Sequence, residues 1–162
     1  MRPALVGFAL PCIFESSRGS EDDITRIDLE IRMNVNYEAT LDHKYIEFAK
    51  LLNCYLNHFP KFEKYALTQE IRKTSYEMYC LMIEAQKRYH KKTTLSNLNI
   101  KHEQLRMLVR LAYSLEYFKY NDGSKTNTED KATHRYFALS RMIDEIGRMI
   151  GGWMKSLKSE KI

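Results

Sequence analysis

Apolar residues recur at intervals of three and four along most of this chain, which is the spacing of one face of an α-helix. Four segments carry this pattern, at about residues 42–59, 60–90, 100–120 and 128–158. The polar stretches 91–99 and 121–130 (NDGSKTNTED) are predicted to be the connections between the later helices. Four amphipathic helices joined by short connections predict an all-α fold, an up-and-down four-helix bundle.

The last helical segment is interrupted by glycines, at Gly147, Gly151 and Gly152. A glycine inside a helix costs about 1 kcal/mol relative to alanine, so close packing is expected to compensate for the missing side chains. Gly147 and Gly151 are four residues apart and therefore share one helix face, beside the apolar stripe that contains Trp153, the only tryptophan. We expect either another helix of the same chain or a neighbouring subunit to pack into this notch.

Charge is distributed unevenly along the chain. The formal net charge is +5. Residues 1–32 contain four arginines and six acidic residues, so they contribute −2 and the remainder contributes +7. A basic helical domain favours polyanionic partners such as nucleic acid. A soluble helical surface with a surplus of lysine explains the same charge, and both interpretations stay open.

The N-terminal part of the chain differs from the rest. Residues 3–14 are apolar, but they are interrupted by Pro11 and lack a clean cleavage site, so they make a poor signal peptide. The acidic stretch that follows shows no helical periodicity. We therefore predict an unstructured N-terminal extension over residues 1–32 and a bundle domain over residues 33–162.

Cysteine usage and hydropathy bear on the compartment. Three cysteines, Cys12, Cys54 and Cys80, form no Cys-x-x-Cys pair and are expected to be free thiols in a reducing environment. The latter two fall within helical patterns, where a free cysteine is usually buried. No apolar run reaches the roughly 18 residues of a membrane span. Together these features predict a cytoplasmic protein that does not enter a membrane.

Motifs for catalysis are missing from the sequence. The five histidines are scattered without a His-Glu-x-x-His or Glu-x-x-His pattern, so neither a metal site nor a cofactor is expected. There is no glycine-rich phosphate loop and no Gly-x-Ser-x-Gly elbow. We expect a protein that is not an enzyme.

The third helical segment carries a basic and aromatic face. Its members are spaced four, four, three and four residues apart: His102, Arg106, Arg110, Tyr113 and Tyr117. Arginine binds phosphate in a bidentate manner, and tyrosine rings can stack on bases. The alternative is that the arginines meet carboxylates and the tyrosines cover the rim of the bundle. The predicted inward positions of the same helix are Leu105, Leu108, Ala112 and Leu115.

The second helical segment adds further cations, at Arg72, Lys73, Lys87, Arg88, Lys91 and Lys92. The last four lie at a helix C-terminus, where the helix dipole favours cations without any ligand. The alternative is a phosphate-contacting patch that is largely independent of base sequence. On the fourth segment, Asp144 is expected to pair with Arg141 and Arg148 on its own helix.

Three segments of the chain resemble a known family. They are Ile143–Ser156 (IDEIGRMIGGWMKS), Phe59–Leu67 followed by Glu70-Ile71-Arg72, and Leu105–Ala112 (LRMLVRLA). In this order they are similar to the accessory variability determinant (Avd) proteins of diversity-generating retroelements, over about residues 41–158. The four-helix proteins encoded by intervening sequences of ribosomal RNA genes are wider relatives. Those proteins usually carry Asn-Ile-Ala-Glu-Gly where this chain has Met82-Ile83-Glu84-Ala85, which favours the Avd branch.

The resemblance implies a barrel-like homo-oligomer, a pentamer of four-helix bundles. It also implies a non-catalytic partner of a reverse transcriptase that binds RNA, and possibly DNA, during mutagenic retrohoming. Several basic residues lie in the matching segments: Lys61, Lys64, Arg72, Arg106, Arg110 and Arg148. The alternative is a structural bundle whose basic faces bind an acidic protein partner.

Overall fold

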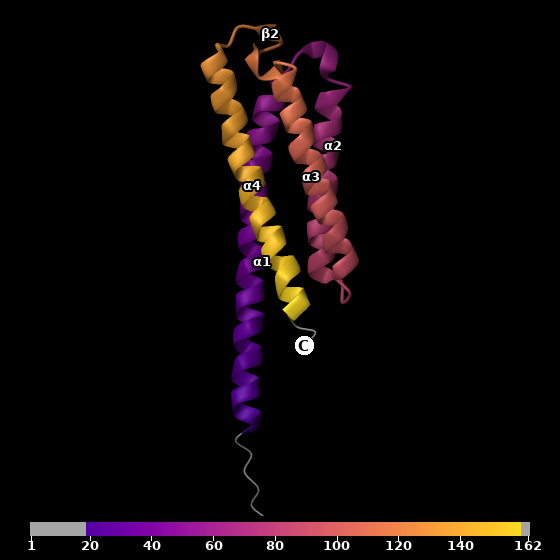
Figure 1. Ribbon diagram of the computed structural model, residues 1–162, viewed down its shortest axis with the longest axis vertical. Helices are drawn as coiled ribbons and strands as arrows, with labels where there is room; N and C mark the ends of the chain where they lie inside the picture. The colour runs from indigo at the N-terminus through magenta and orange to yellow at the C-terminus, as the bar shows by residue number, and fades with distance from the viewer. Residues whose placement is uncertain (1–18, 160–162) are drawn as a thin grey trace, which may run out of the picture. The chain divides into compact units, whose positions relative to one another are not determined.

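The computed structural model describes residues 19–159, and the side chains discussed below lie within residues 37–157. The described residues form four α-helices, shown in Figure 1: α1 (Gly19–Asn57), α2 (Leu67–Lys87), α3 (Lys92–Ser114) and α4 (Glu129–Ser159). The chain divides into two compact units, Met1–Asn36 and Tyr37–Ile162. The second unit contains the bundle.

The first helix begins earlier than the apolar pattern predicts. α1 starts at Gly19 rather than near Asp42. Residues 19–32 are therefore helical, whereas the sequence predicts an unstructured extension there. Residues 1–18, the rest of the predicted extension, lie outside the described residues. The sequence contains a local reason for the early start, because residues 21–23 are acidic and carboxylates in a first turn interact favourably with the helix dipole. Because these residues are acidic, the periodicity of apolar residues does not reveal where the helix begins.

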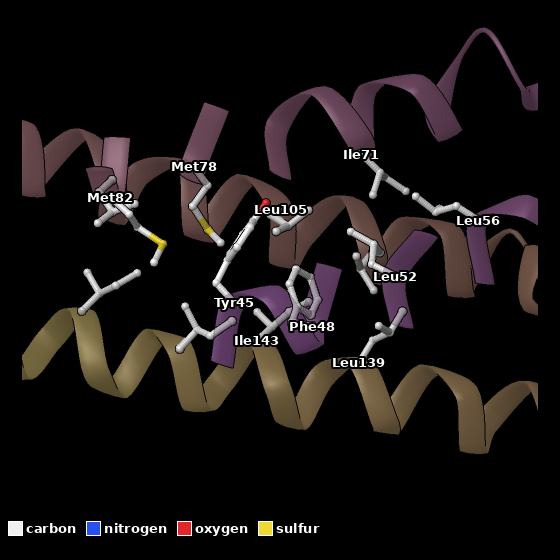
Figure 2. Packing of buried hydrophobic residues seen from close by; sticks show 14 of the residues in the cluster. Tyr45, Phe48, Leu52, Leu56, Ile71, Met78, Met82, Leu105, Leu139 and Ile143 are labelled. Atoms are coloured by element: carbon white, nitrogen blue, oxygen red, sulfur yellow. The ribbon is translucent and has the colours of Figure 1, made fainter. Parts of the chain in front are cut away.

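One apolar core lies between the helices of the second unit, as Figure 2 shows. Every helix contributes fully buried side chains to it: Phe48 and Leu52 from α1, Ile71 and Met78 from α2, Leu105 and Val109 from α3, and Leu139 and Ile143 from α4. The spacing of three and four that predicts the helices is therefore the spacing of the core residues. The all-α four-helix bundle is confirmed.

The second and third helices are joined by a shorter connection than predicted. α3 begins at Lys92, so most of the predicted polar connection 91–99 forms its first turns. Leu95 and Leu98, three residues apart, are fully buried and extend the apolar stripe of α3 toward its N-terminus. Leu95 and Leu98 lie among polar residues, and two apolar positions are too few to establish a helical period.

α3 also ends earlier than predicted, at Ser114 rather than near Tyr120. Glu116 adopts a left-handed conformation (φ 61°), which L-residues seldom take inside a helix, and a short 3₁₀ helix, η2 (Tyr117–Lys119), follows. The turn leaves Leu115, predicted to face inward, 46% exposed.

The predicted loop 121–130 contains part of a short hairpin. β1 (Tyr120–Asn121) pairs antiparallel with β2 (Ser124–Lys125). Asp122 and Gly123 connect the strands with φ values of 49° and 78°, and Asp-Gly is a preferred sequence for hairpin turns with two positive φ angles. The hairpin occupies the connection between α3 and α4.

Tyr45 joins α1 to α2 inside the core. Its hydroxyl lies 2.7 Å from the Ser75 carbonyl oxygen and 2.9 Å from the Ser75 hydroxyl. Burial raises the pKa of Tyr45 to about 12. We expect Tyr45→Phe to lower the free energy of unfolding by about 1 kcal/mol near neutral pH, because the hydrogen bonds to Ser75 are lost.

This difference has a defined pH dependence. The folded-state pKa of Tyr45 is raised, so its neutral hydroxyl stabilises the fold below pH 10 and loses that contribution as the pH rises toward 12. Urea unfolding at several pH values should therefore show the wild-type advantage shrinking above pH 10. An advantage that stays constant from pH 8 to pH 12 would contradict the assignment.

Candidate nucleic-acid interface

Two neighbouring hollows lie between α3 and α4. One, of about 430 Å³, is lined by His102, Arg106, Asp144, Gly147 and Arg148. The other, of about 260 Å³, is lined by Arg106, Met107, Arg110, Tyr136, Ser140 and Asp144. Because Arg106 and Asp144 border both hollows, we treat them as one feature and call it the α3–α4 groove.

The α3–α4 groove carries a positive charge excess. Arg106 is half exposed; its Nε lies 3.5 Å from Glu103 Oε2 and its Nη1 lies 3.8 Å from Asp144 Oδ1. Both distances exceed those of strong charge-assisted hydrogen bonds, about 2.7–2.9 Å. Arg110 and Arg148 are exposed, and their guanidinium groups contact no partner among the described residues. Three guanidinium groups therefore line the groove, and two carboxylates, Glu103 and Asp144, lie within 4 Å of them. The remaining excess of positive charge is a suitable environment for phosphate.

The pairing of Asp144 differs from the prediction. Its carboxylate meets Arg106 of α3, whereas pairing with Arg141 and Arg148 on its own helix was expected. Which arginine pairs with Asp144 depends on where α3 packs against α4, and residue spacing within α4 cannot predict that packing. The consequence is that Arg148 remains available in the groove.

The predicted basic and aromatic face of α3 is only partly realised. Arg106 and Arg110 face solvent, but His102 is buried, and its Nε2 donates to the Ile143 carbonyl at 2.8 Å. Tyr113 stacks on Tyr136 with ring centroids 4.3 Å apart. One face of the Tyr113 ring is therefore covered within the bundle, and its hydroxyl lies 3.0 Å from the Thr133 hydroxyl.

Tyr117 and two cysteines also differ from their predicted environments. Tyr117 lies beyond the end of α3 and donates to Glu63 Oε1 at 2.8 Å. Cys54 and Cys80, expected to be buried, are both exposed free thiols. Their helices present these positions away from the core stripe, as the offset from Leu52 and Met78 requires.

Gly147 accommodates the imidazole of His102. A Cβ atom on Gly147 would lie 2.6 Å from His102 Cε1 and 2.8 Å from Nε2, which is too close for atoms that are not bonded. The imidazole therefore occupies the space that a side chain at Gly147 would take. A Cβ atom on Gly151, in contrast, would have no neighbour within 4 Å. Half of the predicted notch is filled by the same chain, and the other half is open.

Trp153, expected beside the notch, belongs to the core and is 6% exposed. Lys91 Nζ lies 5.6 Å from the centre of its ring, within the range of a cation–π contact. This contact connects the end of α4 to the loop between α2 and α3.

The α2–α3 loop consists of residues 88–91. Four of the predicted cations lie in it or next to it: Lys87, Arg88, Lys91 and Lys92. Arg88 Nε pairs with Glu84 Oε1 at 2.8 Å, and Lys91 Nζ lies 3.6 Å from Glu38 Oε1. Lys87 and Lys92 are exposed, and neither ammonium contacts a partner among the described residues. The first turn of α3 contains no acidic residue, so its positive dipole end adds to the local positive potential.

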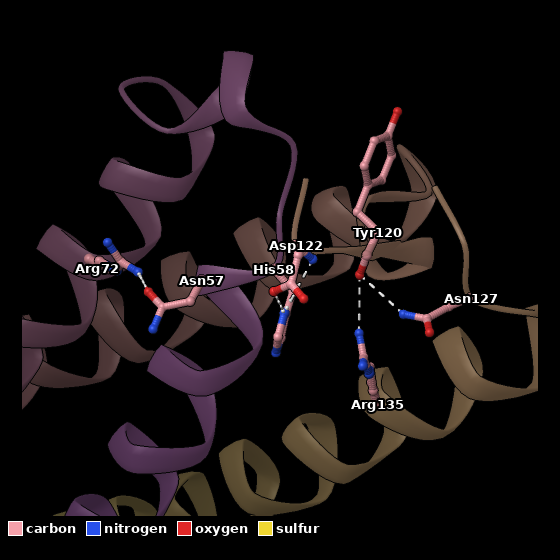
Figure 3. A network of polar contacts seen from close by, with 7 residues as sticks. All are labelled: Asn57, His58, Arg72, Tyr120, Asp122, Asn127 and Arg135. Atoms are coloured by element: carbon pink, nitrogen blue, oxygen red, sulfur yellow. Dashed lines mark hydrogen bonds and ion pairs between the residues drawn. The ribbon is translucent and has the colours of Figure 1, made fainter. Parts of the chain in front are cut away.

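Arg72 and Lys73 lie elsewhere, beside a groove of about 850 Å³ that also includes Lys101 of α3. Arg72 Nη2 donates to Asn57 Oδ1 at 2.6 Å, as Figure 3 shows. Lys73 is exposed and forms no ion pair among the described side chains, but Lys101 and, more weakly, Lys73 lower the pKa of Glu77 beside this groove. The predicted binding residues therefore occupy three surfaces: this groove, the α2–α3 loop and the α3–α4 groove.

The hairpin side of the bundle also contains lysines, but they are paired. Lys119 Nζ lies 2.6 Å from Glu116 Oε1 and 2.5 Å from Glu129 Oε2, and Lys125 also binds Glu116. The hydrogen bonds from Lys119 and Lys125 lower the pKa of Glu116 to about 2. These cations are neutralised within the chain, so they are poor candidates for a polyanion site.

Among the side chains that the structure describes, no group of three or more His, Cys, Asp or Glu residues is placed to hold a metal ion. No helix in the described part of the chain is long and apolar enough to cross a membrane.

The fold and these surfaces define a four-helix bundle with unpaired cations in a groove and at a loop. A family model described as bAvd-like matches residues 40–157. The chain belongs to this family, as the three sequence segments predict. Neither the comparison with curated proteins nor that with solved structures gives a match.

Proposed function

We propose that this chain is a non-catalytic, nucleic-acid-binding accessory protein of a diversity-generating retroelement, which associates with the reverse transcriptase during mutagenic retrohoming. Membership of the bAvd-like family over residues 40–157 carries the proposal. The partners are the reverse transcriptase and RNA, with DNA as a second polyanion, and the setting is the cytoplasm.

The charge distribution supports nucleic acid as a ligand. Arg110 and Arg148 in the α3–α4 groove, and Lys87 and Lys92 at the α2–α3 loop, are exposed without partners among the described residues. Keeping like charges unpaired costs free energy unless an anion compensates them. Phosphates along a strand supply such anions at regular spacing.

A second function is favoured by one observation. Arg106 already meets two carboxylates, Glu103 and Asp144, as expected for a structural bundle. In that case the groove would bind an acidic protein surface, and nucleic acid would be a weak competitor. Salt would weaken both interactions, so the ligand itself has to be identified.

Affinity copurification tests the proposal. Tagged protein, co-expressed with a reverse transcriptase of a diversity-generating retroelement, is expected to retain that polymerase before and after nuclease treatment. Retention that disappears with nuclease would show that nucleic acid alone bridges the two proteins. Failure to retain the polymerase under either condition would contradict the proposed partnership.

We also propose that the protein is a homo-oligomer, a pentamer by family likeness, and that Gly151 lies at the subunit interface. A Cβ atom at Gly151 would have no neighbour within 4 Å among the described residues, and leucine forms helix about 0.8 kcal/mol better than glycine. Gly151→Leu is therefore expected to leave the helical circular dichroism spectrum unchanged but to weaken assembly, since overpacking costs about 1–3 kcal/mol.

Light scattering at micromolar concentration measures the effect. The wild-type protein should be oligomeric, Gly151→Leu should shift toward monomer, and Gly151→Ala should shift less. A wild-type monomer would contradict the oligomer, and a Gly151→Leu variant of wild-type mass would place Gly151 outside the interface.

A further inference from the structure

The most exposed aromatic side chain described in the structure is in the α2–α3 loop. Tyr89 is 93% exposed. Among the described rings, that of Tyr89 meets only that of His90, with centroids 4.8 Å apart in an edge-to-face arrangement, so at most one face of the tyrosine is covered. An aromatic ring in water forgoes the stabilisation that burial would give. No helix in the described part of the chain covers it.

The loop holds this ring outward between two anchored residues. On one side, Arg88 has an extended backbone (φ −76°, ψ 141°), pairs with Glu84 and reaches Thr94 Oγ1 at 3.5 Å. On the other side, Lys91 is held between Glu38 and Trp153. Because both flanks are attached to the bundle, Tyr89 and His90 project from a fixed base.

Lysines flank the projecting ring in the sequence. Lys87 ends α2 and Lys92 begins α3, and both ammonium groups lack partners among the described residues. The loop therefore combines an open aromatic face with exposed positive charges two and three residues away along the chain. This combination is how single strands are held, with bases stacked on rings and phosphates met by lysine.

We propose that the α2–α3 loop is a binding site for single-stranded nucleic acid, with Tyr89 stacking on an unpaired base and Lys87 and Lys92 contacting the adjacent phosphates. The inference rests on the proposed function and names the class of ligand. A duplex is a poor fit, because its bases already cover one another's faces and cannot receive the ring. RNA and DNA present the same base faces, so the site accepts either.

Equilibrium binding of labelled oligonucleotides to the full-length protein tests the site. At constant salt, Tyr89→Ala is expected to weaken single-strand binding by about 5- to 150-fold, the range of one lost base stack. Tyr89→Phe should stay close to wild type. Duplex binding should change little in either variant. Single-stranded RNA and DNA of one sequence are compared in parallel, and similar losses are expected.

Tyr65 provides a matched control. It is 80% exposed and lies near a lysine, with Lys64 Nζ 5.5 Å from its ring centre, but it precedes α2 rather than following it. Tyr65→Ala should bind single strands as the wild type does. A loss in Tyr65→Ala equal to that in Tyr89→Ala would show a general surface effect and overturn the assignment.

The slope of log affinity against log salt concentration distinguishes base stacking from phosphate contacts. Tyr89→Ala should keep the wild-type slope, whereas Lys87→Ala with Lys92→Ala should reduce it by about 1.4, or 0.7 for each phosphate of a single strand. The emission of Trp153, in contact with Lys91, gives a local signal of binding at the loop, and its titration should require more single strand in Tyr89→Ala than in wild type.

The outcomes distinguish this site from the function it rests on. If Tyr89→Ala binds single strands as tightly as wild type, or loses single strands and duplexes equally, the stacking site is wrong and nucleic-acid binding stands. If the wild-type protein binds neither form, the proposed function fails together with the site. If the loop binds an acidic protein instead of nucleic acid, the wild-type protein should bind neither single strands nor duplexes.

Discussion

The double variant Arg106→Ala, Arg110→Ala is expected to fold normally and to bind nucleic acid about 100-fold more weakly than the wild-type protein. A hydrogen bond to a charged group contributes about 1.5 kcal/mol, or about tenfold in affinity for each arginine. The loss of two phosphate contacts should also reduce the log–log slope against salt by about 1.4–1.8. The fold should survive, because both side chains lie outside the core.

The lysines of the α2–α3 loop provide the comparison. Lys91→Ala should have a smaller effect, since Lys91 is already engaged by Glu38 and Trp153. Lys92→Ala removes one contact rather than two. Binding titrations at three salt concentrations, with circular dichroism as a folding control, measure these differences. A folded double variant with wild-type affinity would show that the α3–α4 groove is not the binding site.

Gly147→Leu is expected to lower the free energy of unfolding by about 3 kcal/mol, at the upper end of the usual cost of overpacking. Even a methyl group at this position would overlap the His102 imidazole, which is itself fixed by its hydrogen bond to the Ile143 carbonyl. The gain in helix propensity on replacing glycine by leucine, about 0.8 kcal/mol, offsets only part of this cost. Thermal or urea unfolding measures the effect.

A double-mutant cycle isolates the contact with His102. Gly147→Ala is measured in the wild type and in a His102→Ala background, where the imidazole is removed. The alanine should be destabilising in the first case and neutral or stabilising in the second. Equal costs in both backgrounds would mean that another group, and not His102, requires the glycine.

The helices could be predicted because their buried residues repeat regularly. Leu105 and Val109 of α3, for example, occur one turn apart and are both fully buried. The boundaries were less predictable. Leu95 and Leu98 are too few to show a period by themselves, and the left-handed turn at Glu116 involves a residue type with no special preference for that conformation.

The candidate site was predictable where it depends on one helix and not where it depends on two. The spacing of Arg106 and Arg110 indicates a shared exposed face, and both are exposed. His102 continues the same spacing but is buried, because Gly147 on another helix leaves room for it. Asp144 joins Arg106 for the same reason, through the crossing of α3 and α4.

Binding of single-stranded RNA by the wild-type protein across a range of salt concentrations tests the central claim most directly. Contacts with phosphates release condensed counterions, so the logarithm of the affinity should fall linearly with the logarithm of salt, by about 0.7 for each phosphate. Three or more contacts should give a slope of about −2 or steeper. The absence of measurable binding at low salt, or binding that does not respond to salt, would contradict a nucleic-acid-binding function.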